Sequence, residues 1–149
     1  MSAVSDKVKP CLWFNGQAEA AARFYVSLFA DSEIVSVSSY MVEFRLAGRR
    51  MQALNGGPEY TLNEAFSLSI SCADADEVDR YWSALTADGG RESRCGWLKD
   101  RFGVSWQVVP EGLGAVLGDA DPVRAGRAIQ AMMGMRKLDL AAMRSAADG

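Results

Sequence analysis

Residues 95–110 read CGWLKDRFGVSWQVVP, and this stretch decides the fold. It contains two of the four tryptophans of the chain and a charged turn, KDR. The segment after the turn alternates, which predicts a β-strand with Trp106 and Val108 on one face and Gln107 on the other. A glutamine in the middle of such a strand is a surface residue, a pocket residue or a replaced metal ligand. The rest of the chain has to separate these three interpretations.

The composition is that of an ordinary water-soluble globular chain. With 149 residues, 49% of them hydrophobic and 23% charged, the chain is long enough for one well-buried core. A formal net charge of −3 gives no reason to expect nucleic acid or an anionic membrane as a partner. The start of the sequence, MSAVSDKVK, lacks the apolar block of a signal peptide, and no long apolar run follows. We therefore expect a cytoplasmic protein that binds neither nucleic acid nor membrane.

The absence of histidine restricts the chemistry more than any other feature. The chain has no histidine, so the commonest metal ligand, the usual general base and any Ser–His or Cys–His pair are excluded. Its three cysteines, Cys11, Cys72 and Cys95, are an odd number without CxxC spacing. They are typical of reduced, mostly buried thiols rather than of a disulfide framework or a zinc site.

The hydrophobic pattern predicts the same order of elements twice. The first half predicts a strand, a helix, three strands and a loop, at residues 8–14, 17–29, 33–40, 42–46, 50–54 and 55–58. In the second half, strand 65–72 is followed by a helix that Asp74 caps, with Glu77 completing a capping box. A strand or irregular arm at 92–97 and a closing strand at 104–109 complete the second half. No turn residue separates Tyr40 from Met41, between the strands predicted at 33–40 and 42–46.

The two halves also align residue by residue. Placing Arg23 on Arg80 superimposes the aromatic pairs that follow them, and placing Gly48 on Gly103 superimposes Gln52 on Gln107. A repeat of this kind indicates two copies of one supersecondary unit. We therefore predict an α+β fold with two tandem βαβββ modules, at about 8–58 and 64–110, within a domain of residues 1–112.

Residues 113–149 lie outside the repeat. Asp121 and Pro122 predict a helix start, and apolar residues at helical spacing predict two short amphipathic helices about Gly134. We expect this C-terminal extension to pack on the same domain or on a second subunit.

Four stretches carry a family resemblance. They are PCLWFNGQAEAA at 10–21, FYVSLF at 24–29, MQALNGGP at 51–58 and the sequence at 95–110. Together they closely resemble the PhnB-like branch of the glyoxalase/bleomycin-resistance (vicinal oxygen chelate) superfamily, whose members often carry the label 3-demethylubiquinone-9 3-methyltransferase. The resemblance implies paired βαβββ modules curled around a cavity, and a homodimer.

The resemblance also implies where a metal would lie. Metal enzymes of the superfamily take a glutamate from the last strand of each module, and Gln52 and Gln107 occupy these positions. The first-strand ligands correspond to Pro10 and Ser67. None of these four side chains is a strong ligand for a divalent cation. We therefore predict no metal and no other cofactor.

The predicted cavity is neutral and rich in hydrogen-bonding groups. Its expected ligand-binding residues are Gln52, Gln107, Ser67, Ser69, Leu12, Phe14, Leu54 and Trp97. Trp97 is equally well interpreted as a core or dimer residue, and Trp106 is interpreted as core.

These observations favour a metal-free, homodimeric protein that binds a small organic ligand of unknown identity. The alternative is an enzyme of the superfamily, either a lyase or isomerase or the methyltransferase of the family label. The first needs an acid or base, for which Glu43 is the candidate, although it is also interpreted as a solvent-exposed charge. The second needs a glycine-rich turn between a strand and a helix, and the loop at 55–58 is not followed by a helix pattern.

Overall fold

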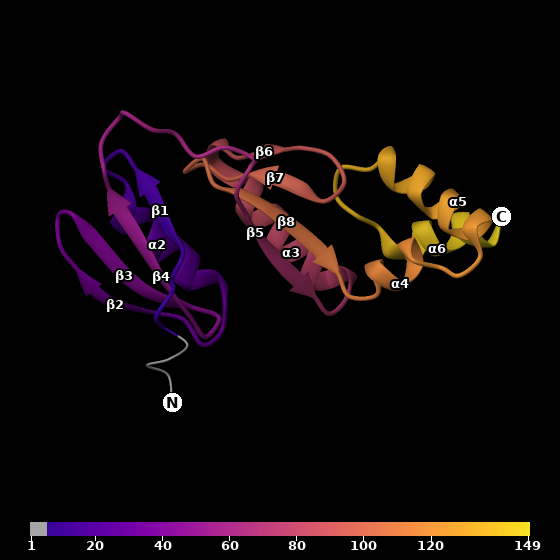
Figure 1. The fold of residues 1–149 in the computed structure, drawn as a ribbon, viewed down its shortest axis with the longest axis horizontal. Coiled ribbons are helices and arrows are strands. Elements are labelled where there is room, and N and C mark those ends of the chain that lie inside the picture. Colours follow the sequence, from indigo (N-terminus) through magenta and orange to yellow (C-terminus); the bar gives the residue numbers. More distant parts are fainter. Residues whose placement is uncertain (1–5) are drawn as a thin grey trace. The chain divides into compact units, whose positions relative to one another are not determined.

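The structure, a computed structural model, describes residues 6–149, and the chain divides into two compact units, Met1–Leu62 and Asn63–Gly149. Figure 1 draws the first unit in indigo and purple and the second from magenta to yellow. Each unit contains one four-stranded sheet. Among the described residues, no helix is both long enough and apolar enough to cross a membrane.

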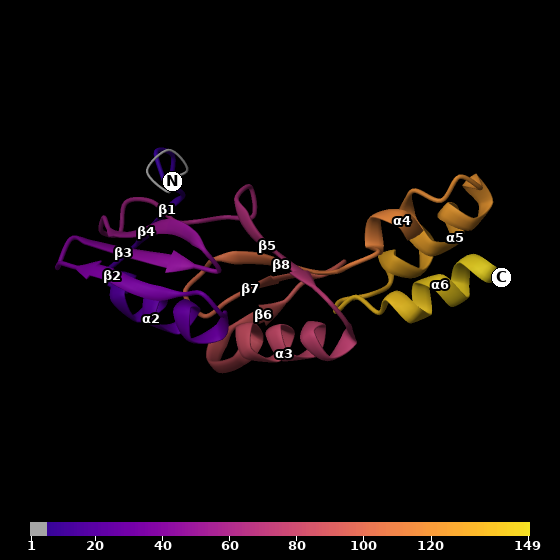
Figure 2. The same ribbon diagram turned by 90° about the horizontal axis from the view of Figure 1, so that it is seen from below.

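The first unit consists of a strand, a helix and three further strands. These are β1 (Cys11–Phe14), α2 (Ala18–Leu28), β2 (Glu33–Val37), β3 (Met41–Leu46) and β4 (Arg49–Asn55). The strands lie in the order β1-β4-β3-β2, with β1 parallel to β4 and the other pairs antiparallel. Figure 2 shows α2 along one face of this sheet. Functional side chains of the strands therefore have to be sought on the opposite face.

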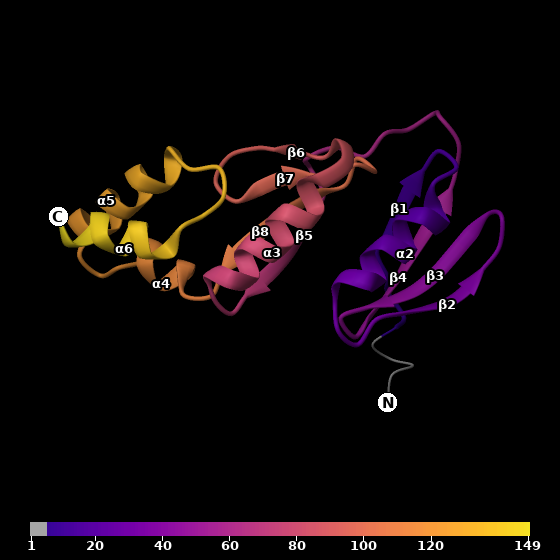
Figure 3. The ribbon, with the colours of Figure 1, turned by 180° about the vertical axis from the view of Figure 1, so that it is seen from behind.

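The second unit repeats this order and adds helices. Its elements are β5 (Ser67–Cys72), α3 (Ala75–Thr86), the 3-10 turn η1 (Ala87–Gly89), β6 (Arg91–Glu92), β7 (Trp97–Lys99), β8 (Ser105–Pro110), α4 (Leu113–Leu117), α5 (Pro122–Met133) and α6 (Leu140–Asp148). The strand order, β5-β8-β7-β6, is that of the first sheet, and Figure 3 shows α3 on one face. The predicted α+β fold, with two βαβββ modules and C-terminal helices, is confirmed.

The core of each unit lies between its sheet and its helix. Met51 and Ala53 of β4 and Trp106 and Val108 of β8 are each at most 1% exposed, as the alternation predicted. Small residues of α2, among them Ala18, allow the helix to lie close to the sheet. Burying a large apolar side chain such as Met51 stabilises a fold by about 1.5–3 kcal/mol.

The helix starts use the predicted caps. Asp74 accepts a hydrogen bond from the N–H of Glu77 at 2.9 Å, and the Glu77 carboxylate accepts one from the N–H of Ala73 at 3.0 Å. Asp121 caps α5 by accepting from the N–H of Val123, with Pro122 in the first helical turn. These side chains satisfy backbone donors that have no partner within the helix.

The sequence reading was incomplete in two places. The arm predicted at 92–97 is two short strands joined by a bend at Cys95 and Gly96, whose N–H groups donate to the carbonyls of Met135 and Arg136. The chain between α5 and α6 therefore contacts the edge of the second sheet. The sequence analysis also missed α4, which is a single short turn.

The hairpin between β2 and β3 closes without glycine or proline. The hydroxyl of Ser38 accepts hydrogen bonds from the N–H groups of Tyr40 and Met41, at 3.3 and 3.0 Å, and the Ser38 N–H donates to the Met41 carbonyl. A serine turn of this type replaces the expected turn residues. The hairpin is therefore a short one that the Ser38 side chain closes.

Asp100 organises the hairpin between β7 and β8. Its carboxylate is 3% exposed and accepts hydrogen bonds from the N–H groups of Phe102 and Val104, at 2.8 and 3.1 Å, and from the indole N–H of Trp106, at 2.8 Å. Gly103, at a φ of +91°, completes the turn by donating to the Asp100 carbonyl. Asp100 belongs to the charged turn KDR, but its carboxylate lies inward, because it accepts hydrogen bonds from local backbone donors and from the indole.

We expect Asp100→Ala to lower the free energy of unfolding by about 3 kcal/mol, because buried donors lose a charged acceptor. The measurement is urea unfolding followed by tryptophan fluorescence. Asp88→Ala is the matched control, since the Asp88 side chain is 81% exposed and pairs with Arg101 only at 3.8 Å. An equal effect of the two substitutions would contradict the role assigned to Asp100.

Candidate functional site

The face of the first sheet opposite α2 carries part of the predicted site. The register places Gln52 between Cys11 of β1 and Glu43 of β3, and places Leu54 beside Trp13. Residues paired across neighbouring strands share a face of the sheet. Gln52, Leu54 and Glu43 therefore lie on the same face of the sheet.

The placement of Leu12 and Phe14 on this face was wrong. They pair with Ala53 and Asn55 on the helix side, and their exposed fractions are 0% and 3%. The sequence around them is a continuous apolar run without alternation, so it could not reveal which residues point to which side. Asn55 accepts a hydrogen bond from the N–H of Ala18 at 2.9 Å, which provides the cap that α2 lacks locally.

Trp13, which the sequence analysis did not select, occupies this face instead of Leu12 and Phe14. Its indole N–H donates to the carbonyl of Gly57 at 2.9 Å, and its ring meets Tyr60 edge-on at 5.0 Å between centroids. A β-carbon on Gly56 would overlap the Trp13 ring, so the glycines of the loop allow the ring to lie flat against the backbone. The loop therefore holds the Trp13 side chain in place. The next element after the loop is the strand β5, not a helix.

Glu43 is held in an ion pair. Its carboxylate lies 3.2 Å from the Arg50 guanidinium, and both side chains are 30% exposed. Arg50 also lies 4.0 Å from Asp6. Glu43 is thus neither a freely solvated charge nor a carboxylate in an apolar pocket, which is the environment that makes a carboxylate a general base at neutral pH.

The corresponding face of the second sheet brings the remaining predicted residues together. Ser69 and Trp97 both pair with Gln107, and Ser67 pairs with Ser105. The Gln107 amide donates to the Ser67 hydroxyl at 3.0 Å. These are the two positions at which the family resemblance places metal ligands, and they satisfy each other as a neutral pair.

Neutral donors of this kind do not fit a divalent cation. An amide and a hydroxyl offer no negative charge to offset the dehydration of the ion. Among residues 6–149, no group of three or more cysteine, aspartate, glutamate or histidine side chains is close enough to hold a metal.

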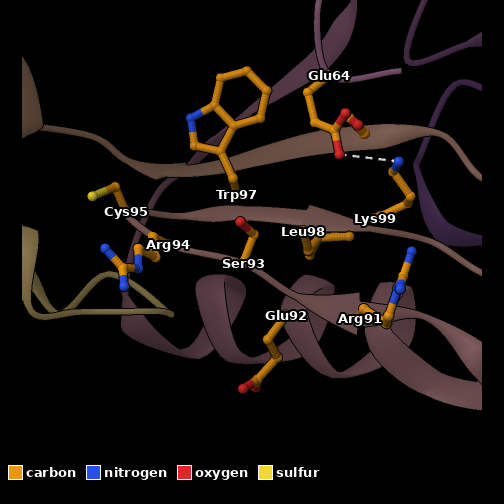
Figure 4. A pocket seen from close by; sticks show the side chains of 10 residues that line it. Glu64, Arg91, Glu92, Ser93, Arg94, Cys95, Trp97, Leu98 and Lys99 are labelled. Carbon is orange, nitrogen blue, oxygen red and sulfur yellow. Dashed lines mark ion pairs between the residues drawn. The ribbon is translucent and has the colours of Figure 1, made fainter. Parts of the chain in front are cut away.

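An open pocket of about 660 Å³ lies beside this face, along β6 and β7. Figure 4 shows Trp97 in its middle, with Arg94 and Cys95 on one side and Arg91 and Lys99 on the other. The volume is within the range of small-molecule sites, roughly 300–1,000 Å³. Trp97 is partly exposed here, which favours the ligand-binding interpretation over the core interpretation.

Ser105 is the pocket residue that the sequence analysis missed. It is 2% exposed, and its hydroxyl has no hydrogen-bond partner within the described part of the chain. It lines the pocket and pairs with Lys99 on the Gln107 face. The alternation around Gln107 does place Ser105 on that face, but its missing partner cannot be inferred from sequence.

The thiols of Cys11 and Cys72 are not activated as nucleophiles, because their pKa values are raised. Desolvation raises the pKa of Cys11, although part of this residue reaches solvent. Burial, followed by the charge of Glu77, raises the pKa of Cys72 to about 11. A reactive cysteine needs a lowered pKa, so neither thiol is poised for catalysis.

Comparison with known families identifies one match. The family model described as 3-demethylubiquinone-9 3-methyltransferase matches residues 6–109, which include both sheets and end before α4. No curated protein matches the chain.

Solved structures share the fold. The PhnB protein from Bacillus cereus is 31% identical, with a TM-score of 0.65, and the match covers 70% of this chain and 98% of that protein. A glyoxalase/bleomycin resistance protein from Albidiferax ferrireducens is 14% identical, with a TM-score of 0.54 and coverage of 69% and 96%. The fosfomycin resistance protein FosX from Listeria monocytogenes, solved with Mn(II) and sulfate, is 15% identical, with a TM-score of 0.55 and coverage of 74% and 94%. The last two show the fold alone.

The buried Cys72 thiol predicts a loss of stability in alkali. Its pKa is raised from 9.0 in the unfolded chain to about 11 in the folded protein. Between these pH values the unfolded chain releases the thiol proton while the folded protein keeps it. The free energy of unfolding is therefore unaffected below pH 9 and falls as the pH rises to 11. We expect urea midpoints to fall over this window and Cys72→Ala to flatten the decline. Cys95→Ala, the control, should keep it. Parallel pH profiles for the unmodified protein and Cys72→Ala would contradict this assignment.

Proposed function

The chain belongs to the 3-demethylubiquinone-9 3-methyltransferase family, the PhnB-like branch of the glyoxalase/bleomycin-resistance superfamily, and from this premise we propose that it binds a small organic molecule without a metal ion. The proposed binding site is the pocket along β6 and β7 of the second unit. The observation that carries the proposal is the unpartnered, buried hydroxyl of Ser105 in that pocket.

An unpartnered buried hydroxyl is costly. A polar group removed from water without a new hydrogen bond destabilises a protein by about 1–3 kcal/mol. Native structures leave few such groups, and those that remain call for an explanation. A ligand that supplies the missing partner explains why a serine occupies this position, and the partly exposed Trp97 ring offers it an apolar surface.

Two further features support binding without a metal. The positions expected for metal ligands in the second module hold the Gln107–Ser67 hydrogen bond, which is a neutral pair. In the first module, Gln52 lies beside Glu43, whose carboxylate is already paired with Arg50 at 3.2 Å and so does not offer an unbalanced negative charge to a metal ion.

No observation favours the enzymatic alternatives. Methyl transfer, which the family description names, lacks a glycine-rich strand-to-helix turn in the described chain, since the Gly56–Gly57 loop holds Trp13 and leads to no helix. Lyase or isomerase chemistry needs a free acid or base on the sheet face, and the Glu43 carboxylate is ion-paired there.

We expect purified protein, dialysed without chelator, to bind no Mn²⁺ in isothermal titration calorimetry. The double substitution Ser67→His with Gln107→Glu is the positive control, because it places an imidazole and a carboxylate on two side chains that already touch at 3.0 Å. It should acquire measurable Mn²⁺ binding. Stoichiometric Mn²⁺ binding by the unmodified protein would refute the metal-free proposal.

We expect Ser105→Ala to have opposite effects on stability and on binding. Removing the unpartnered hydroxyl should raise the free energy of unfolding by about 1 kcal/mol. The melting shifts produced by compounds from a library of planar charged and neutral molecules should shrink, because the ligand loses a hydrogen bond. Ser71→Ala, at an exposed position of the neighbouring strand β5, is the control and should change neither. If no compound shifts the melting temperature of the unmodified protein, the binding function is wrong.

A further inference from the structure

The charges around the pocket are unequally partnered. Both of its carboxylates are engaged: Glu64 accepts from Lys99 at 3.0 Å, and Glu92 accepts from the indole N–H of Trp82 at 2.7 Å and lies 3.7 Å from Arg136. Each negative charge in the lining therefore already has a partner.

Two of the three cations in the lining have none. Arg91 and Arg94 form no ion pair or side-chain hydrogen bond with another residue in the described range 6–149. Arg91 pairs with Lys99 in the sheet register, so both project from the pocket face, and Figure 4 shows their side chains extending in the same direction. The pocket therefore has unbalanced positive charge close to an aromatic ring and a hydroxyl without a partner.

A carboxylate of the protein itself, that of Glu64, already lies at the positively charged part of the pocket. The Glu64 carboxylate reaches Lys99 from the segment before β5, and its side chain is 68% exposed. The hydrogen bond from Lys99 is the main cause that lowers the pKa of Glu64, a backbone hydrogen bond comes second, and the charge of Arg91 contributes least. The cationic end of the pocket thus holds a carboxylate, and an exposed ion pair of this kind is weak enough to be exchanged.

We propose that the pocket binds a planar organic anion, an aromatic or conjugated carboxylate, whose carboxylate is held by Arg91 and Lys99 in competition with Glu64. The ring lies against Trp97, and a polar atom of the ligand bonds the Ser105 hydroxyl. This inference rests on the proposed binding function and specifies the chemical class of its ligand. Arginine suits the role because its planar donors match the two oxygens of a carboxylate.

The competition with Glu64 gives the proposal a distinctive signature. Removing a cation from the pocket weakens anion binding, whereas removing the internal carboxylate strengthens it. If these residues had only a structural role, the two substitutions would change the affinity for the anion in the same direction or not at all.

The test is isothermal titration of the full-length protein with naphthoate and with the neutral naphthalene methanol, at low and high salt. We expect naphthoate to bind more tightly than the alcohol, and to bind more weakly as salt screens the charges. Arg91→Gln should weaken naphthoate binding about tenfold, the effect of losing a charge-assisted hydrogen bond. Glu64→Gln should tighten it about threefold, since an exposed competing pair is worth little.

Arg80→Gln is the matched control. It makes the same charge change in the same unit, on an exposed side chain of α3 that pairs with Glu77 outside the pocket. It should leave naphthoate affinity within about twofold, since exposed charges contribute little. Trp97→Leu should weaken naphthoate binding about threefold or more, through loss of ring contact.

The remaining outcomes distinguish failure of the anion proposal from failure of the proposed binding function. Equal affinity for naphthoate and the alcohol, or weaker naphthoate binding by Glu64→Gln, overturns the anion proposal while the binding function stands. Absence of binding by both probes, together with absence of any melting shift in the compound library, overturns the ligand class and the binding function together.

Discussion

The second unit depends on one buried interaction, the hydrogen bonds that the Asp100 carboxylate accepts from the turn backbone and from the Trp106 indole. Trp106 is the largest fully buried side chain, and it faces the helix side of the sheet. The bond to Asp100 therefore ties the core to the turn. On either side of that turn, Lys99 and Ser105 are paired and project to the opposite face. The interaction that anchors the core also sets the positions of two pocket residues.

The two modules use equivalent positions differently. In the first, Gln52 lies beside Glu43 across the strands and two residues after Arg50, and these charges satisfy each other at 3.2 Å. In the second, the residues at the corresponding positions around Gln107 are Trp97 and Ser105. An ion pair fills its own hydrogen-bonding needs, whereas an indole ring and an unpartnered hydroxyl do not. Divergence within the repeat thus explains why the candidate site belongs to the second module.

Much of the fold could be predicted because local and long-range signals agree. The strand β5, the alternation of β8 and the Asp74 cap each depend on neighbours in sequence, and the structure has all three. The errors have a common cause, since they concern strand partners and hydrogen-bond partners that the alternation of apolar and polar residues does not specify. The register against β4 turns Leu12 toward the helix, and the indole of Trp106 draws Asp100 inward. No pattern along the chain reveals that the Ser105 hydroxyl lacks a partner.

The physical balance of the pocket links its stability to its function. We expect a serine at position 105 to stabilise the fold less than an alanine would, because its buried hydroxyl finds no hydrogen-bond partner among the described residues. Arg91, which has no ion-pair partner among residues 6–149, is paired with Lys99 in the sheet register and adds repulsion between like charges at this side of the pocket. Glu64 relieves part of this repulsion by pairing with Lys99, but it does so from an exposed position where an ion pair is weak. An anionic ring compound satisfies the hydroxyl, the excess charge and the Trp97 surface at once. The features that cost stability in the free protein are thus the ones that such a ligand would turn into binding energy.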